Sequence, residues 1–147
     1  MKDVIIKIKG TQILEDHKEV IEFTTLGKLG HKDGKFYLTY KENDSFGTED
    51  VTTTVKIESD KLVTMQRTGA IESRLTIENG KRHMCHYVTM QGEIMIGIFG
   101  ETIKNDLNEN GGQLFMSYTI DVNYGMLSRN EVEIKVSEVK KDVDSFH

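Results

Sequence analysis

The sequence predicts an all-β fold, a single antiparallel up-and-down (meander) β-barrel of about 8–10 strands. Three observations support this prediction. Apolar and polar residues alternate with period two along most of the 147 residues, as in strands with one buried face. Turn residues interrupt the alternation about every 8 to 14 positions. The chain has 13 glycines and no proline, so glycine, Asn and Asp must make nearly every reversal.

Five strands are expected in the first half of the chain. Each is a run in which alternating residues place β-branched or aromatic side chains on one face. The runs span residues 4–13, 20–26, 36–41, 51–58 and 62–69. Polar or glycine-containing segments at 15–17, 29–34, 43–50 and 59–60 are the expected reversals.

Five further strands are expected in the second half. They are a short strand at 75–77, then 83–89, 94–103, 114–122 and 132–136. Asn79-Gly80 is the strongest hairpin sequence, and we expect a type I′ turn there, with positive φ at both residues. Other turns are expected at 91–92, 108–112 and 123–125, and the spacing of Val136, Val139 and Val143 allows one C-terminal helical turn.

A meander of ten strands has two edges, and closing the sheet into a barrel removes both. Two packed sheets are the alternative. Glycines inside the strands favour the barrel, because barrels place glycine at sharp bends and close backbone approaches; they are Gly10, Gly27, Gly69, Gly97 and Gly100. We therefore expect residues 1–147 to form one barrel domain, with 140–147 as a frayed C-terminal tail.

Several short patterns spread over nearly the whole chain resemble a known family. In order, they are Tyr40-Lys41-Glu42, Gly47, Thr52-Thr53, Lys56-Ile57, Arg67-Thr68-Gly69, Tyr87-Val88-Thr89, Gly92, Gly111-Gly112 before Leu114, Tyr118 and Asn130. Together they resemble the YwiB-like family of uncharacterised small bacterial proteins. This resemblance implies a lipocalin-like (calycin) barrel, similar to lipocalins and fatty-acid-binding proteins, in a bacterial cytoplasm. It implies no biochemical activity.

Charge and composition limit the expected partners. The formal net charge is −5 and the lysines are scattered, so no basic stripe for nucleic acid is formed. Apolar runs are far shorter than the roughly 20 residues of a membrane span, and no membrane association is expected. The single Cys85 cannot form an internal disulfide, and Met1-Lys2-Asp3 does not begin a secretory signal. We expect a cytoplasmic protein, with a small-molecule ligand or a homodimer as candidate interactions.

No catalytic residue, cofactor or metal site is predicted. His83 and Cys85 share one strand face while His86 points to the other, so at most two of them can bind one ion. The segment 106–111 matches the first half of an EF-hand loop, but Ser117 stands where a glutamate is required, which favours a polar hairpin loop. Motifs for nucleophilic catalysis, phosphate loops and dinucleotide sites are absent from the sequence, so an enzyme in the barrel mouth is the least favoured interpretation.

The candidate ligand-binding residues are Arg67, Tyr87 and Tyr118. Arg67 shares a strand face with Val63 and Met65. If this face is the interior, the guanidinium needs an acidic partner or a bound anion. In a calycin-like barrel the arginine would anchor a ligand carboxylate, and the two tyrosines would offer hydroxyl groups. These residues suggest that the barrel binds a small amphipathic or anionic ligand.

Two alternatives remain open at this point. Arg67 can instead cap the end of the barrel beside Glu42 or Glu72. The core can also be filled, which would make the protein a structural or protein-interaction module without a ligand. Four methionines, Met65, Met84, Met95 and Met116, are either the lining of an adaptable pocket or ordinary core residues.

Overall fold

The computed structural model describes residues 1–42, 51–69, 72–89 and 92–139, and the predicted closed antiparallel barrel is confirmed. Its ten strands are β1 (Lys2–Ile13), β2 (Lys18–Lys32), β3 (Lys35–Lys41), β4 (Val51–Ser59), β5 (Leu62–Gly69), β6 (Glu72–Glu78), β7 (Arg82–Thr89), β8 (Gly92–Asn105), β9 (Gly111–Val122) and β10 (Gly125–Glu138). Each strand pairs with its neighbours in sequence, and β10 pairs with β1 to close the sheet. Within the described residues, nothing forms a helix that could span a membrane.

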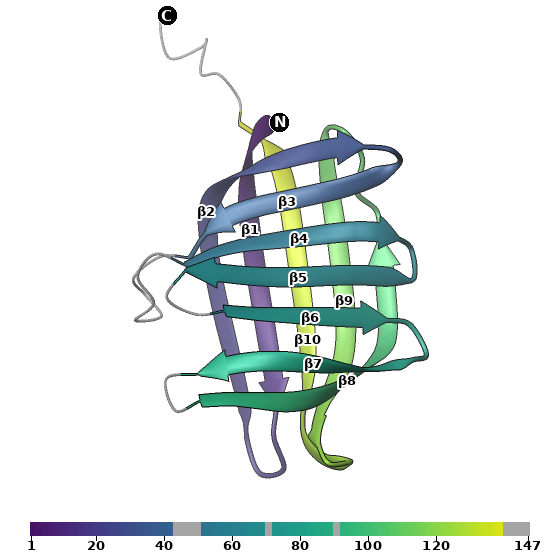
Figure 1. The fold of residues 1–147 in the computed structure, drawn as a ribbon. Coiled ribbons are helices and arrows are strands. Elements are labelled where there is room, and N and C mark those ends of the chain that lie inside the picture. Colours follow the sequence, from purple (N-terminus) through teal and green to yellow (C-terminus); the bar gives the residue numbers. More distant parts are fainter. Residues whose placement is uncertain (43–50, 70–71, 90–91, 140–147) are drawn as a thin grey trace, which may run out of the picture.

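The barrel is flattened into two layers of strands. Figure 1 shows β3 to β7 crossing in front of β1, β9 and β10, which run in a different direction behind them. The long strand β2 belongs to both layers, because it pairs with β1 along most of its length and with β3 from Gly27 onward. At Gly27 a Cβ atom would lie 2.5 Å from Ile6 Cδ1 and 2.6 Å from the carbonyl oxygen of Thr39. Glycine therefore allows the close approach at this corner.

The second strand is longer than predicted. The expected reversal at 29–34 is wrong, because β2 continues to Lys32 and only Asp33 and Gly34 form the turn, with φ of 54° and 77°. Leu29 is buried opposite Leu38, and burial of that pair keeps the segment extended. The hydrophobic contact outweighs the turn preference of the surrounding glycine and polar residues.

The hairpin at Asn79-Gly80 has a different turn from the one predicted. Lys81 N–H donates to the Glu78 carbonyl at 3.1 Å, so the chain reverses here as expected. Positive φ occurs at Gly80 (79°) but not at Asn79, which matches type II rather than type I′. A type I′ pattern is found instead at Asn123 and Tyr124, with φ of 53° and 68°. The β6–β7 strands diverge beyond their turn, so the tight twist of a type I′ hairpin is not needed there.

The last strand is also longer than predicted. It spans Gly125–Glu138 and includes Val136, so the expected helical turn does not begin at that residue. Pairing with β1 continues to Glu138 and holds this segment extended. Val143, the candidate tail 140–147, the loop 43–50 and the turn residue Gln91 lie outside the described residues.

Aliphatic side chains fill much of the barrel. The largest fully buried ones are Ile6, Leu38, Ile57, Ile77, Ile98, Leu114, Met116, Ile134, Val4, Val51, Val55 and Val63. Most of them lie toward the barrel end that holds the N-terminus and the β2–β3, β4–β5 and β6–β7 turns. This part of the barrel has the filled core that the sequence left as an alternative.

The four methionines do not form one pocket. Met116 is fully buried and Met65 packs against the core, but Met84 and Met95 are 51% and 41% exposed on the outer face. Their neighbours Cys85 and Ile96 are the inward-facing residues of β7 and β8. Strand alternation therefore turns Met84 and Met95 outward.

Candidate functional site

A row of polar side chains crosses the interior of the barrel on five adjacent strands. Tyr40 pairs with Thr53, Thr53 with Arg67, Arg67 with Ser73, and Ser73 with Tyr87. Residues directly opposite one another in an antiparallel sheet lie on the same face. We call these five residues the interior polar row.

The row faces inward because its strands bury the alternate residues of the same parity. Val55 and Val63 are fully buried and lie on the same strand faces as Thr53 and Arg67. The sequence left the direction of Arg67 and Tyr87 open, and the strand register places both inside. Glu72 is exposed and precedes Ser73, so it lies on the outer face and is not the partner of Arg67.

Arg67 is both an interior residue and one half of an ion pair. Its Nη2 donates to Glu42 Oε2 at 2.5 Å, and the two side chains are 23% and 13% exposed. Burial lowers the pKa of Arg67, but the hydrogen bond and charge of Glu42 outweigh it and raise the pKa overall. The alternative in which Arg67 lies beside Glu42 is therefore realised within the barrel.

Tyr118 reaches the same region from β9. Its side chain is buried, and burial together with the nearby Tyr87 raises its pKa to about 12, although the charge of Arg67 acts in the opposite direction. The phenol is therefore neutral near pH 7 and can donate or accept a hydrogen bond. The structure thus places the three predicted ligand residues, Arg67, Tyr87 and Tyr118, close enough to interact electrostatically.

Three atoms of the interior polar row are buried without a hydrogen-bond partner among the described residues. They are Thr53 Oγ1, Arg67 Nε and Ser73 Oγ; of these, Thr53 also interacts with the Tyr40 phenol across the β3–β4 pair. Thr53 is 1% and Ser73 is 7% exposed, so neither hydroxyl lies in bulk solvent. Each unpaired buried polar group costs about 1–3 kcal/mol. Three on neighbouring strands concentrate this cost in one small region, which the sequence alone did not reveal.

A cavity of about 230 Å³ lies at the end of the barrel nearest the β1–β2 turn. Its lining includes Gln12, Glu19, Ile21, Tyr118 and Asn130. We call this end the mouth. Tyr118 lines the cavity and interacts electrostatically with Arg67, so the interior polar row approaches the cavity at Tyr118. Arg67 and Ser73 themselves line a neighbouring pocket of about 280 Å³, together with Glu72, Arg74 and His86.

The mouth also has apolar surface. Ile21 faces inward opposite Gly10, and Ile94 faces inward opposite Tyr87, yet each is 48% exposed. Exposed apolar groups beside unpaired polar atoms can bind a molecule that has both kinds of surface.

The cysteine and histidines of β7 do not form a metal site. Cys85 is buried, its Sγ accepts the Thr76 N–H at 3.4 Å, and burial raises the pKa of its thiol. His83 interacts with Glu78 at 2.7 Å, and His86 with Glu93. Across the described ranges, no group of three His, Cys, Asp or Glu residues could hold a metal ion.

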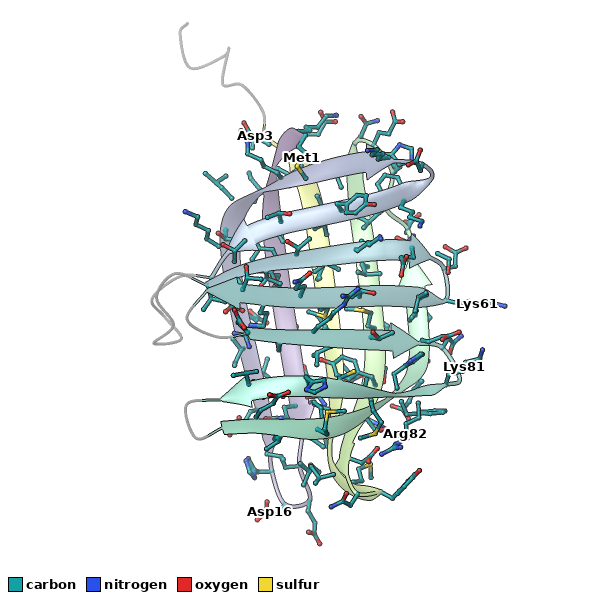
Figure 2. The ribbon with its side chains drawn as sticks, in the orientation of Figure 1. Met1, Asp3, Asp16, Lys61, Lys81 and Arg82 are labelled. Carbon is teal, nitrogen blue, oxygen red and sulfur yellow. The ribbon has the colours of Figure 1, made fainter. Side chains whose placement is uncertain are left out.

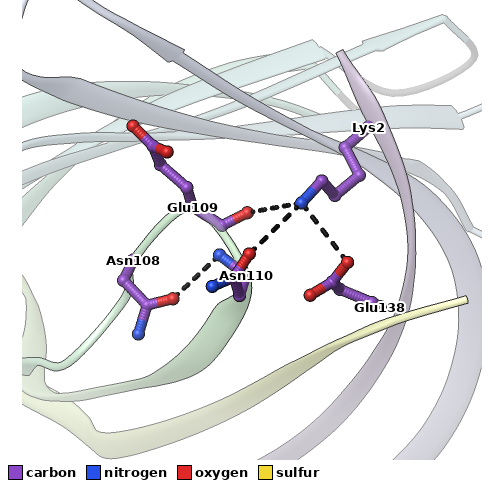
Figure 3. A network of polar contacts seen from close by, with 5 residues as sticks. All are labelled: Lys2, Asn108, Glu109, Asn110 and Glu138. Carbon is purple, nitrogen blue, oxygen red and sulfur yellow. Dashed lines mark hydrogen bonds and ion pairs between the residues drawn. The ribbon is translucent and has the colours of Figure 1, made fainter.

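The EF-hand-like segment is a loop between β8 and β9, and several of its oxygens accept hydrogen bonds from within the chain. Figure 3 shows Lys2 Nζ donating to the Glu109 carbonyl at 3.1 Å, to Asn110 Oδ1 at 3.5 Å and to Glu138 Oε2 at 3.4 Å. Asn110 N–H donates to Asn108 Oδ1 at 2.8 Å. The loop therefore ties the N-terminus to β10.

An ion pair on the outer face was not foreseen from the sequence. Arg82 Nε and Nη2 donate to the two carboxylate oxygens of Asp121 at 2.9 and 2.7 Å, and the guanidinium carbon lies 4.0 Å from the Tyr124 ring centroid. Figure 2 shows Arg82 on the outside of the barrel. A Cβ on Gly97 would collide with both charged groups. A glycine inside a strand, Gly97, was the sequence feature that could have indicated this ion pair. It leaves space for the Arg82 and Asp121 side chains across β7, β8 and β9.

Comparison with known proteins adds the family. Residues 6–134 match the domain of unknown function DUF1934. The chain is 31% identical over 119 residues to the uncharacterized beta-barrel protein YwiB of Bacillus subtilis (strain 168), an alignment that covers 80% of this chain and 82% of that protein. The crystal structure of YwiB superimposes with a TM-score of 0.82 at 25% identity and covers 95% of this chain and 93% of that one. The expected resemblance is thereby confirmed, and the chain belongs to the DUF1934 family of YwiB-like β-barrel proteins.

Proposed function

We propose that this protein binds a small amphipathic molecule at the mouth of its barrel. The polar head of the ligand lies against the interior polar row, and its apolar part lies against Ile21 and Ile94. The observation that carries the proposal is the set of three buried, unpaired polar atoms, Thr53 Oγ1, Arg67 Nε and Ser73 Oγ, on adjacent strands. A ligand that pairs with them recovers free energy that the protein alone does not gain.

The size of the cavity limits the ligand. Drug-sized ligands occupy clefts of about 300–1,000 Å³, whereas the cavity at the mouth measures about 230 Å³. The aliphatic side chains beyond it are fully buried and leave no extension for a long acyl chain. The ligand is therefore compact, unlike the long-chain ligands that fill an open barrel.

The proposal also includes a class of protein and a cellular compartment. We place the protein among calycin-like binding proteins, and the inward-facing Arg67 and Tyr118 support this assignment. We place it in the cytoplasm, and the free thiol of Cys85 supports a reducing compartment.

The ligand can be tested with hexanamide, which has a short apolar chain and a neutral polar head. We expect hexanamide to shift the amide NMR signals of the interior polar row and to bind the double variant Thr53→Val, Ser73→Ala about tenfold more weakly, since two hydrogen bonds are lost. Thr64→Val is the matched control, because Thr64 is a buried residue of the same strand as Arg67 but lies on the opposite face of the sheet. Equal binding to wild type and the double variant would contradict the proposal.

A homodimer is the second candidate, as a protein-interaction module without a ligand. Exposed apolar side chains on the outer face of β7, β8 and β10 favour it; they include Met84, Met95, Phe99 and Met126. Met84 is opposite Gly97, which is opposite Asp121, which is opposite Met126, so these residues share one face. Sedimentation equilibrium tests this candidate. A wild-type dimer that the variant Met126→Lys dissociates would support it, and a wild-type monomer would contradict it.

A further inference from the structure

We propose that Glu42 makes the mouth selective for a neutral, hydrogen-bond-accepting head such as an amide or ketone carbonyl, and against a carboxylate. This inference rests on the proposed function and adds the chemical class of the ligand and the residue that determines it. An unpaired interior arginine would predict the opposite preference, because a guanidinium binds carboxylates through two parallel hydrogen bonds.

Glu42 already compensates the charge of Arg67. Glu42 Oε2 lies 2.5 Å from Arg67 Nη2, and both side chains are mostly shielded from water. Glu42 is held in place, because its backbone N–H donates to the Val51 carbonyl at 2.9 Å. A ligand carboxylate would have to displace Glu42 or lie beside it in a poorly solvated region. Both options cost free energy, since like charges repel most strongly where water is excluded.

Three polar atoms of the interior polar row remain available to bind a ligand. Arg67 Nε can only donate a hydrogen bond, whereas the hydroxyls of Thr53 and Ser73 can donate or accept. A carbonyl oxygen accepts from more than one of these groups without bringing a charge. An ammonium head has donors only, so it cannot pair with Arg67 Nε, and its positive charge lies close to the guanidinium.

The cavity wall is negatively charged. Glu19 and Glu131 line the cavity, and its described lining contains no lysine or arginine. Glu19 has one positive neighbour when His17 is protonated, since His17 Nε2 lies 3.3 Å from its Oε1. The wall therefore adds negative potential beside Tyr118, where the cavity approaches the interior polar row, and this potential disfavours an anionic head that enters through the cavity.

Three probes of nearly equal size and different charge test this preference. Hexanamide, hexanoate and hexylamine are titrated into the full-length protein at pH 7 and fixed ionic strength, with binding followed by the amide NMR signals. For the wild-type protein we expect hexanamide to bind at least tenfold more tightly than hexanoate or hexylamine. Wild-type protein that binds hexanoate as tightly as hexanamide overturns the inference, even though the proposed function survives.

The variant Glu42→Gln isolates the role of the carboxylate. It keeps the size and the hydrogen-bond acceptor of the side chain but leaves the charge of Arg67 uncompensated. We expect hexanoate to bind this variant more tightly than hexanamide, a change of at least tenfold in their affinity ratio. Glu131→Gln is the control, because it removes the same charge from the cavity wall without contacting Arg67. It should narrow the preference for hexanamide over hexanoate but not reverse it.

The outcomes separate the two proposals. Reversal in Glu42→Gln but not in Glu131→Gln supports Glu42 as the specificity residue. An unchanged ratio in Glu42→Gln, or the same reversal in both variants, overturns that assignment while leaving ligand binding intact. If none of the probes binds the wild-type protein, the proposed function fails and this inference fails with it. The dispersion of the amide signals shows whether each variant is folded. If Glu42→Gln does not fold, the affinities of the wild-type protein for the three probes decide the charge preference.

Discussion

Two buried serines, Ser73 and Ser128, differ in a way that predicts opposite effects on stability. Ser73 Oγ has no partner among the described residues, whereas Ser128 Oγ accepts from Asn130 Nδ2. Ser73→Ala removes an unpaired buried hydroxyl, so we expect the free energy of unfolding to rise by about 1 kcal/mol. Ser128→Ala leaves the Asn130 amide without its acceptor, so we expect a decrease of about 1 kcal/mol. Urea unfolding measures both; an equal loss in the two variants would show that Ser73 is satisfied in solution.

The ion pair between Asp121 and Arg82 should make the stability of the protein depend on pH. The hydrogen bond from Arg82 lowers the pKa of Asp121 below its ordinary value of 3.8, so the ionised carboxylate is favoured in the folded state. This contribution is complete above that ordinary value and is lost as the pH falls through the lower, folded-state pKa. The melting temperature of Asp121→Asn should therefore lie below that of the wild type at pH 7, and the difference should shrink as the pH falls below about 4. A difference that is constant with pH would contradict the pairing.

At the residue scale, the sequence showed which side chains share a strand face but not which face is buried. Alternation in β5 places Arg67 with Val63 and Met65, but it does not say which face is buried, because Leu62 and Thr64 offer a second face. The register with β4 decides this, and register depends on contacts between strands. The unpaired hydroxyls could not be predicted for the same reason, since hydrogen-bond satisfaction is a property of neighbours in space.

At the element scale, β6 and β7 have the shortest ladder of the described strand pairs. This ladder consists of Glu72 with Val88 and Ser73 with Tyr87, with a further bridge at the turn between Glu78 and Lys81. Between them, Thr76 N–H donates to a sulfur atom, Cys85 Sγ, rather than to a carbonyl. We call residues 74–77 and 83–86 the seam.

The seam should open more readily than the rest of the barrel. We expect the seam amide protons that face across the β6–β7 gap, rather than toward β5 or β8, to exchange with solvent faster than those of the β1–β10 ladder, which runs without interruption from Val4 and Glu138 to Ile13 and Arg129. Hydrogen exchange followed by NMR measures this residue by residue. If the seam amides were as well protected as those of β1 and β10, then β6 and β7 would be held together more strongly than their short ladder indicates.

The presence of each strand was easier to predict from the sequence than its length. All ten expected strands are present, because period-two alternation reflects burial of one face. The error at β2 arose from Gly30 and His31, which resemble turn residues in the sequence. In the structure, Gly30 leaves room for the Met1 side chain, and the His31 ring stacks on Phe36 with centroids 4.4 Å apart. These contacts involve residues distant in sequence, so local turn preference could not reveal them.

At the scale of the whole molecule, closure followed from the need to protect sheet edges, and the structure closes through β1 and β10. The division of the interior was less predictable. One part of the barrel is filled by aliphatic side chains, while the mouth combines the interior polar row with a small cavity. The sequence offered an open or a filled barrel as alternatives, and the molecule contains a region of each kind.

We propose above all that the unpaired atoms of the interior polar row bind the head of a ligand. A high-resolution crystal structure of the protein with hexanamide tests it most directly. We predict density for the amide at the mouth, with its carbonyl oxygen about 2.7–3.2 Å from Arg67 Nε and from the hydroxyl of Thr53 or Ser73. Ordered water or protein groups that satisfy all three atoms, unchanged by hexanamide, would contradict the claim.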